Sequence, residues 1–245
     1  MPTIYSSSSG TKDDGYIYKS ASSWASARDA TSGTVQTSGT SNSNFTLASK
    51  GPARGGGSSF IFYRSFMVFD TSGIIGTLAS ATLSIRGFNS NDGSVIAVKS
   101  NAYGGDGGTS LASGDFDAIA GFSTGSSLAG SATVYGSQIL TSSWSTSGYN
   151  NFTATSDLLT DMKNQNVVII CFMDYTNDYL NSALTSNVTL NCGAYYAEYT
   201  GTTRDPKIDY TLVTGYGNAV NGVASANIGK INGVATASIE KVNGI

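Results

Sequence analysis

The sequence of 245 residues contains no histidine, and charged side chains make up only 12% of it. Because histidine is the commonest general base and metal ligand near neutral pH, histidine-based hydrolase triads and imidazole metal sites are excluded. The formal net charge is −3 and lysine and arginine form no cluster, so the chain lacks the basic surface that binds nucleic acid. Serine, threonine, glycine and asparagine fill the polar positions, which indicates a surface of hydroxyl and amide groups.

Cysteine and long apolar runs are also scarce. Cys171 and Cys192 form no metal-binding pattern, so we predict two free thiols, with one disulfide as the alternative. The longest apolar run, Val167–Met173, is too short to cross a bilayer, and we expect no insertion into a membrane. The N-terminal residues lack the basic and apolar regions of a secretory signal, which favours a protein assembled in a cytoplasm.

The most informative stretch is residues 60–88, whose pattern predicts two strands of a β-sandwich. In Phe66–Phe69 every side chain is apolar, which is typical of a central strand covered on both faces. Thr82–Arg86 alternates between polar and apolar residues, as expected of a strand with one face in water. Between them, Asp70–Gly73 has the turn chemistry of a capped corner. This pattern, in a chain of this length, favours one all-β antiparallel domain.

Changes in composition divide the chain into three parts. We expect an N-terminal arm at residues 1–12, a β-sandwich domain at residues 13–214 and a tail at residues 215–245. Within the domain, Ser156–Asn164 predicts one short helix, with a capping serine and apolar residues on one stripe. Lys207–Val213 predicts the closing strand and follows a proline, whose missing N–H does least harm at a strand start.

The tail repeats with a period of eleven residues. Each unit places two apolar residues three positions apart and follows them with Asn-Gly, as in a short helical turn. Because a unit this short is not stable alone, we predict that the repeat anchors the chain in an assembly. A flexible linker of glycine and alanine is the alternative. The apolar positions assigned to assembly are Val220, Val223, Ile228, Ile231, Val234, Ile239 and Val242.

Two stretches of the domain carry a family resemblance. R-S-F-M-V-F-D-T-S-G-I at Arg64–Ile74 and A-S-A-T-L-S-I at Ala79–Ile85 resemble the signature of the DNRLRE-type β-sandwich domains, and Asp205–Thr211 resembles the last strand of that family. The resemblance implies a jelly roll over most of residues 13–213. It does not imply one function, because such domains occur in carbohydrate-binding modules, cell-surface proteins and phage virion proteins. The C-terminal repeat resembles tails of bacteriophage structural proteins.

Without histidine, hydrolysis of a glycosidic bond would need a pair of carboxylates. Asp115 with Asp117 and Asp174 with Asp178 have suitable spacing, but each pair stands in a turn-like stretch where aspartate caps backbone groups. We therefore expect no enzymatic activity and no required cofactor. A calcium ion held by loop oxygens is the alternative, and its candidate ligands are Asn91, Asp92 and Asp106.

Aromatic residues among hydroxyl and amide side chains are typical of sugar-binding sites, and burial in the core is the alternative role for each of them. If they bind a ligand, several copies on one particle would strengthen a weak site. The candidate ligand-binding residues are Trp144, Tyr149, Tyr175 and Tyr179.

The sandwich pattern, the phased repeat and the missing export signal favour a non-enzymatic structural protein of a bacteriophage virion, either a capsid decoration or head-fibre protein or a tail-fibre subunit. It would be assembled in the host cytoplasm, and its expected partners are copies of itself, other virion proteins and host-surface glycans. The first alternative is a carbohydrate-binding module or adhesin on a cell surface. The second is a polysaccharide-cleaving enzyme.

Overall fold

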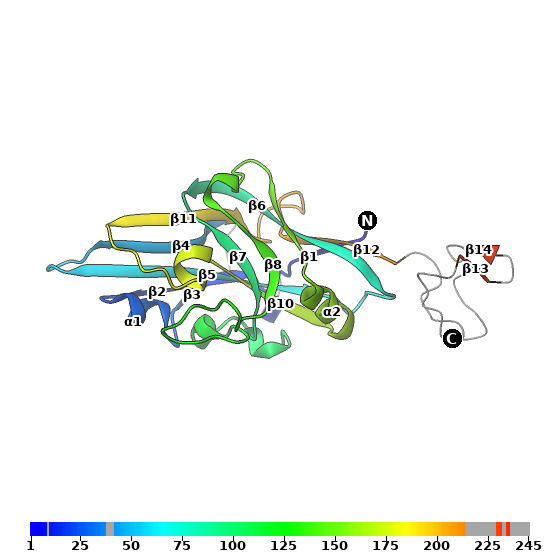
Figure 1. Ribbon diagram of the computed structural model, residues 1–245, viewed down its shortest axis with the longest axis horizontal. Coiled ribbons are helices and arrows are strands. Elements are labelled where there is room, and N and C mark those ends of the chain that lie inside the picture. Colours follow the sequence, from blue (N-terminus) through cyan, green and yellow to red (C-terminus); the bar gives the residue numbers. More distant parts are fainter. Residues whose placement is uncertain (9, 38–41, 214–228, 232–233, 236–245) are drawn as a thin grey trace.

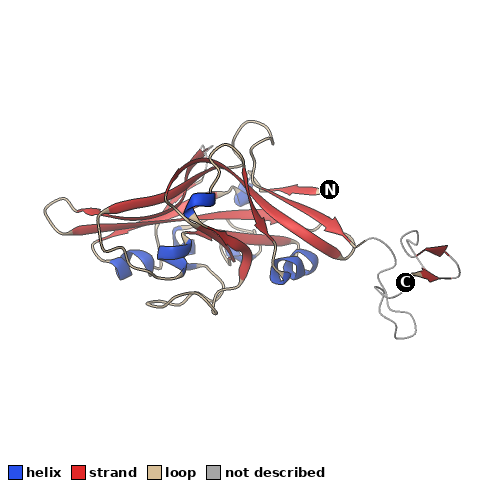
Figure 2. Ribbon diagram, turned by 45° about the horizontal axis from the view of Figure 1, so that its top comes forward, coloured by secondary structure: helices blue, strands red, loops and turns tan. Residues whose placement is uncertain are grey.

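The computed structural model describes residues 1–8, 10–37, 42–213, 229–231 and 234–235. Strands form the body of the described chain, and short helices lie at its periphery (Figure 1, Figure 2). None of the described helices is long and apolar enough to cross a membrane. The strands of the domain are β1 (Thr3–Tyr5), β2 (Gly15–Ala21), β3 (Thr34–Gln36), β4 (Asn42–Pro52), β5 (Ser58–Asp70), β6 (Leu78–Asn91), β7 (Val95–Lys99), β8 (Val134–Ile139), β9 (Tyr149–Thr153), β10 (Val167–Met173), β11 (Val188–Tyr195) and β12 (Lys207–Leu212). The helical segments are α1 (Trp24–Arg28), α2 (Ser156–Asn164), η1 (Gly10–Lys12), η2 (Tyr103–Gly105), η3 (Ser113–Asp117), η4 (Thr141–Ser143) and the π-type turn η5 (Tyr175–Tyr179).

The twelve strands form one antiparallel sheet that curls on itself, which confirms the predicted all-β antiparallel sandwich. The hydrogen-bonded order is β1-β12-β6-β11-β4-β5-β10-β7-β8, with β2 paired to β5, β3 to β2 and β9 to β6. Strand β5 changes partner along its length, because β4 pairs with its residues 58–63 and β10 with its residues 65–70. The β4–β5 hairpin and the end of β12 lie at opposite ends of the long axis of the sandwich (Figure 1).

The sheet carries an apolar core on each of its faces. Phe66 and Val68 of β5 point into an outer core, and Met67 and Phe69 point into an inner core, so the predicted central strand covered on both faces is confirmed. The curl of the sheet encloses the inner core. The outer core is covered by α1, η3, η5 and parts of residues 101–131. Burial of each large side chain stabilises the fold by about 1.5–3 kcal/mol.

Strand β6 shows the predicted alternation, with one departure. Leu83 and Ile85 point into the inner core, while Thr82 and Ser84 lie on the opposite face. Ser84 is nevertheless buried, and its hydroxyl donates to Oδ1 of Asn151 on the neighbouring strand β9, at 2.9 Å. Thr82 and Arg86 on the same face are partly exposed, so the predicted wet face is present except at Ser84.

The predicted corner and the predicted helix both form. Oδ1 of Asp70 accepts hydrogen bonds from the backbone N–H and the hydroxyl of Ser72, and these bonds lower the pKa of Asp70. Helix α2 spans the predicted residues, but its cap is Thr155 rather than Ser156. The Thr155 hydroxyl accepts from the backbone N–H of the third helical residue, as a residue just before the first helical position does.

The two cysteines are free thiols, as predicted, and both are buried. Cys171 belongs to the outer core and Cys192 to the inner core, so the sheet separates them. Burial raises the pKa of both thiols, to about 12 for Cys192. Both therefore act as protonated packing residues.

Only small parts of the repeat tail belong to the described residues. Lys230–Ile231 (β13) pairs with Val234–Ala235 (β14) in a short antiparallel ladder, where the sequence predicted a helical turn. The Asn-Gly between these strands lies outside the described residues. The other apolar positions assigned to assembly lie outside the described residues; they are Val220, Val223, Ile228, Ile239 and Val242.

Candidate functional site

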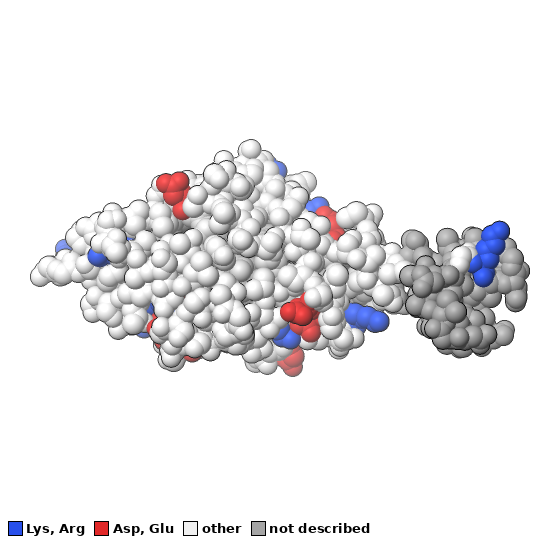
Figure 3. Space-filling view, viewed as in Figure 1, with Lys and Arg blue, Asp and Glu red and all other residues white. Residues whose placement is uncertain are grey.

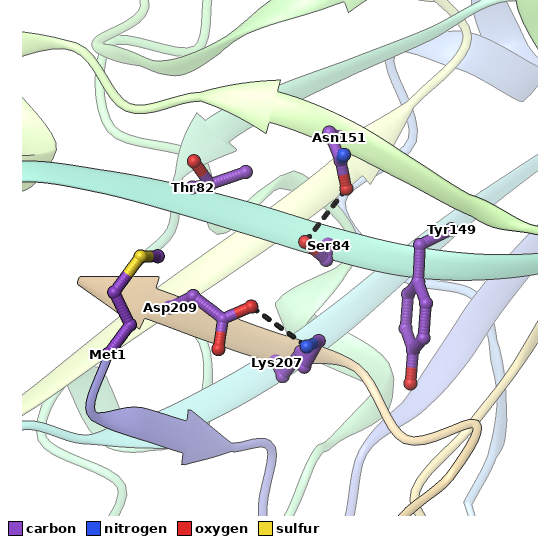
Figure 4. Close-up of a pocket in the computed structure, with 7 residues that line it drawn as sticks. All are labelled: Met1, Thr82, Ser84, Tyr149, Asn151, Lys207 and Asp209. Atoms are coloured by element: carbon purple, nitrogen blue, oxygen red, sulfur yellow. Dashed lines mark hydrogen bonds and ion pairs between the residues drawn. The ribbon is translucent and has the colours of Figure 1, made fainter.

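A polar groove with a volume of about 330 Å³ lies on the outer face of β6, β9 and β12 (Figure 4). Strand register builds it, because residues directly opposite each other in an antiparallel pair project from the same face. Ser84 stands opposite both Asn151 of β9 and Lys207 of β12, and Thr82 stands opposite Asp209. The residues that line the groove are Met1, Thr82, Ser84, Tyr149, Asn151, Lys207 and Asp209.

An ion pair forms one wall of the groove. The Lys207 ammonium lies 2.8 Å from Oδ2 of Asp209, and the Thr3 hydroxyl of β1 donates to Oδ1 of the same carboxylate at 2.5 Å. Partial burial acts to raise the pKa of Asp209, but hydrogen bonds from Lys207 and Thr3 outweigh it and hold this pKa below its usual value. The hydrogen bond to Asp209 in turn raises the pKa of Lys207. Both groups therefore stay charged at neutral pH.

Tyr149 stands at the end of the groove beside Lys207 (Figure 4). Its hydroxyl lies 3.1 Å and 3.2 Å from the carbonyl oxygens of Thr203 and Asp205, which fix the ring in place. The Lys207 ammonium lies 5.1 Å from the ring centroid, and the Arg86 guanidinium lies 5.9 Å from it. The groove thus combines a held aromatic ring with amide, hydroxyl, ammonium and carboxylate groups, an arrangement suited to a small ligand rich in hydroxyl groups.

The four predicted sugar-binding residues do not meet in one site. Tyr149 lines the groove, whereas Trp144 is 7% exposed and belongs to the inner core. The Trp144 indole packs 6.0 Å from the Phe45 ring and donates its N–H to the carbonyl of Gly193 at 3.3 Å.

Tyr175 and Tyr179 lie elsewhere, with their rings stacked 5.7 Å apart against the outer core. Of the four residues, only Tyr149 lies beside the polar groups of the groove. The groove residues Thr82, Ser84, Lys207 and Asp209 were not singled out from the sequence, since only the strand register brings them together.

Three of the four candidate carboxylates, those of Asp115, Asp174 and Asp178, bind protein groups. The Asp174 carboxylate caps η5 and accepts from the N–H and hydroxyl of Ser94 at 3.1 Å and 3.0 Å. Asp115 accepts from the N–H of Tyr103 at 3.2 Å and from a second backbone N–H at 3.0 Å. The Asp178 carboxylate is fully buried and belongs to an ion cluster.

This ion cluster joins β5 to η5. The Arg64 guanidinium donates two hydrogen bonds to the Asp178 carboxylate, at 2.7 Å and 2.6 Å. It also donates to the carbonyls of Phe116 and Arg28, each at 2.8 Å. Burial acts to lower the pKa of Arg64, but the adjacent Asp178 raises this pKa by more, so the Arg64 guanidinium stays charged. The cluster fastens η3, α1 and η5 to the sheet. An arginine within an apolar strand is the only sequence signal that marks it.

The candidate calcium ligands belong to two separate turns. Asn91 donates to the carbonyl of Thr189 at 2.5 Å, and Asp92 follows it with a φ of 49°. Asp106 accepts from the backbone N–H of Gly108 at 2.8 Å. In the part of the chain that the structure describes, no three His, Cys, Asp or Glu side chains are arranged to hold a metal ion. A calcium site stays a prediction.

Comparison of the sequence with models of protein families finds no match, and comparison with curated proteins finds none either. The resemblance to DNRLRE-type domains therefore stays a prediction. The function has to be inferred from the residues and their geometry.

Proposed function

We propose that this chain is a non-enzymatic structural protein of a bacteriophage particle, a capsid decoration, head-fibre or tail-fibre subunit that displays its sandwich and is anchored through the C-terminal repeat. The observation that carries the proposal is the phased repeat, which begins at Val220, a short segment after the closing strand. Strand β12 ends at one end of the long axis, so the domain could project away from an anchor placed there (Figure 1). Its partners in the particle are other copies of the chain and other virion proteins.

The sparse charge of the surface supports a displayed structural role. The visible face carries a few isolated lysine, arginine and acidic side chains on a largely uncharged surface (Figure 3). Such a surface has no strong field of one sign that would attract nucleic acid. It relies on hydroxyl and amide groups for contact with its surroundings.

Replacing Ile228, Ile231, Val234 and Ile239 together by serine is expected to abolish incorporation into particles, because the apolar positions that repeat in phase are lost. The thermal unfolding of the sandwich should stay unchanged. Quantitative mass spectrometry of purified particles measures the copy number. Thr236→Ala with Ser238→Ala, in the same segment, is the matched control and should be incorporated normally. Unchanged incorporation of the serine variant would contradict the anchoring role.

A carbohydrate-binding role is the second candidate, and the groove beside Tyr149 favours it. Asn151 and Lys207 can donate hydrogen bonds to sugar hydroxyls, and Asp209 can accept them. The volume of about 330 Å³ suits a ligand of one or two sugar units. Several copies on one particle would turn weak single-site binding into firm attachment.

Tyr149→Ala and Asn151→Ala are each expected to weaken glycan binding about tenfold, since each removes a contact worth roughly 1–1.5 kcal/mol. Binding is measured on a glycan array and then by titration with the best ligand. Thr153→Ala, on the same strand but outside the groove lining, should bind like the original chain. Retained binding in both groove variants would exclude this groove as the glycan site.

A further inference from the structure

Asp14 and Glu198 bring two carboxyl groups together where the N-terminal segment meets the segment between β11 and β12. The Asp14 side chain is fully buried, and its Oδ2 accepts from the Ser6 hydroxyl at 2.9 Å and the Ala197 N–H at 3.1 Å. Glu198 directly follows Ala197, whose N–H bonds to Asp14, and the neighbouring Glu198 carboxyl helps to raise the pKa of Asp14. Both Glu198 oxygens are buried and have no donor among the described residues. Because ionised carboxylates only accept hydrogen bonds, the two groups can bond only when one carries a proton.

Further acidic groups surround this pair. The Oδ1 atoms of Asp13 and Asp205 are also buried without a donor within the described chain, and Asp205 is 6% exposed. Both carboxylates act to raise the pKa of Glu198. Tyr103 and Tyr196 are buried nearby, and this burial raises the pKa of both tyrosines, so they are neutral. The surroundings therefore add negative charge and offer no positive charge.

The lysine and arginine residues close to this region contact other groups. In the described part of the chain, none of the ion pairs includes any of the four carboxyl groups. Arg204, which precedes Asp205, donates to the Tyr195 hydroxyl at 2.8 Å and lies 4.7 Å from the centroid of that ring. The aliphatic part of the Lys12 side chain lies beside Gly107, and its charge helps to lower the pKa of Asp70.

We propose that Asp14 and Glu198 share one proton and form a pH-sensitive latch, which holds strand β1 and residues 196–206 in place and opens when both carboxyl groups ionise. Two like charges in contact within a dry site cannot both ionise without a large cost. Burial and the adjacent Glu198 carboxylate raise the pKa of Asp14 well above its ordinary value. Burial raises the pKa of the neighbouring Asp205 to about 6.

The latch holds together elements that also build the groove. The Ser6 N–H donates to the carbonyl of Pro206 at 2.9 Å, which joins the two latched segments directly. Met1, which precedes β1, and Lys207, which follows residues 196–206, both line the groove. The carbonyls of Thr203 and Asp205, within residues 196–206, hold the Tyr149 hydroxyl. Opening would therefore take the groove apart. That consequence for binding rests on the proposed carbohydrate-binding function, whereas the latch itself does not.

The sign of the pH dependence follows from the raised pKa values. The folded chain holds protons on these carboxyl groups that the unfolded chain loses near its ordinary pKa of about 4. The stabilising contribution is complete below that pH and is lost as the pH rises through the folded-state pKa values. The unfolding equilibrium constant should therefore rise up to about tenfold per pH unit for each extra proton held by the folded chain.

The experiment compares the full-length chain with Asp14→Asn and Glu198→Gln between pH 5 and pH 9. An asparagine at position 14 copies the protonated carboxyl, because its oxygen accepts while its amide donates to Glu198. The free energy of unfolding, measured with urea, should fall less steeply with rising pH in both variants than in the original chain. The difference in slope should correspond to about one bound proton. Hydrogen exchange of the peptides 1–14 and 195–206, expressed as protection relative to the intrinsic exchange rate at each pH, should show loss of protection in the original chain at pH 9 and retained protection in Asp14→Asn. The exposed Asp157→Asn is the matched control and should behave like the original chain.

Infrared difference spectra of the original chain provide a readout that does not depend on whether a variant folds. A protonated-carboxyl band should be present at pH 7 and disappear as the latch opens. Absence of this band at pH 7, or an unchanged pH slope in both variants, would overturn the proposal. So would stabilisation of the original chain, but not of Asp14→Asn, by millimolar calcium at pH 8, because the pair would then hold a metal ion. Loss of glycan binding at pH 5, with the latch intact, would count against the groove alone.

Discussion

Arg64→Met is expected to destabilise the sandwich by about 3–5 kcal/mol, because it leaves the buried Asp178 carboxylate without its main partner. Both side chains are fully buried, and two short hydrogen bonds join them. The remaining guanidinium, Arg28, has its Nε 3.5 Å from Asp178 and compensates only in part. The loss also frees the carbonyl of Phe116 from its partner. Urea unfolding with a two-state analysis measures the change.

Two comparisons make this result specific. Lys99→Met breaks the partly exposed pair with Asp161, joined at 2.8 Å, and should cost about 0–1 kcal/mol. The double variant Arg64→Met with Asp178→Leu should be more stable than Arg64→Met alone, because it removes the unpaired Asp178 carboxylate while Arg28 keeps its ion pair with Asp29. A single-variant loss below about 1 kcal/mol would show that the ion cluster does not hold η5 and η3 to the sheet.

Trp144→Ala is expected to cost about 3–5 kcal/mol, since it empties space in the inner core. The indole packs against Phe45 and donates to the carbonyl of Gly193. No side chain larger than that of glycine fits at position 87 of β6, because a Cβ there would lie 2.8 Å from the indole nitrogen of Trp144. The indole is thus tightly enclosed and has a packing role.

Trp144→Phe separates packing from hydrogen bonding. It keeps much of the volume and removes the N–H, so it should cost roughly 1–2 kcal/mol, less than the alanine variant. Thermal unfolding and glycan binding are measured on the same samples. A folded, fully stable Trp144→Ala variant that had lost glycan binding would show that this tryptophan contacts the ligand and would contradict the core role.

The domain combines a rigid, buried body with an exposed groove. Two apolar cores and a buried ion cluster hold the sheet and the segments over its outer face. The groove is built instead from the outward residues of β6, β9 and β12 and from Met1, which precedes β1, a strand with no buried side chain. Regions with few buried contacts open at lower cost than a core does. We therefore expect opening of the proposed latch to affect the groove more than the two cores.

The local sequence pattern determined the strands and the helix. Consecutive apolar residues at Phe66–Phe69 predicted a strand covered on both faces, and strict alternation at Thr82–Arg86 predicted the inward side chains of β6. The α2 helix could also be predicted, because capping and periodicity act within a few residues. The same local reasoning treated aromatic residues as equivalent, and so it could not separate the buried Trp144 from Tyr149 in the groove.

Only the tertiary structure decided which distant side chains meet. Arg64 and Asp178 are 114 positions apart, and Asp14 bonds to a backbone N–H 183 positions away. The groove likewise depends on the register that sets Ser84 opposite Lys207. Register and sheet curl arise from packing across the whole domain, and a shift of one residue would turn every side chain of a strand to the other face. Periodicity therefore identifies which residues are buried, while the assembled sheet decides which of them become neighbours.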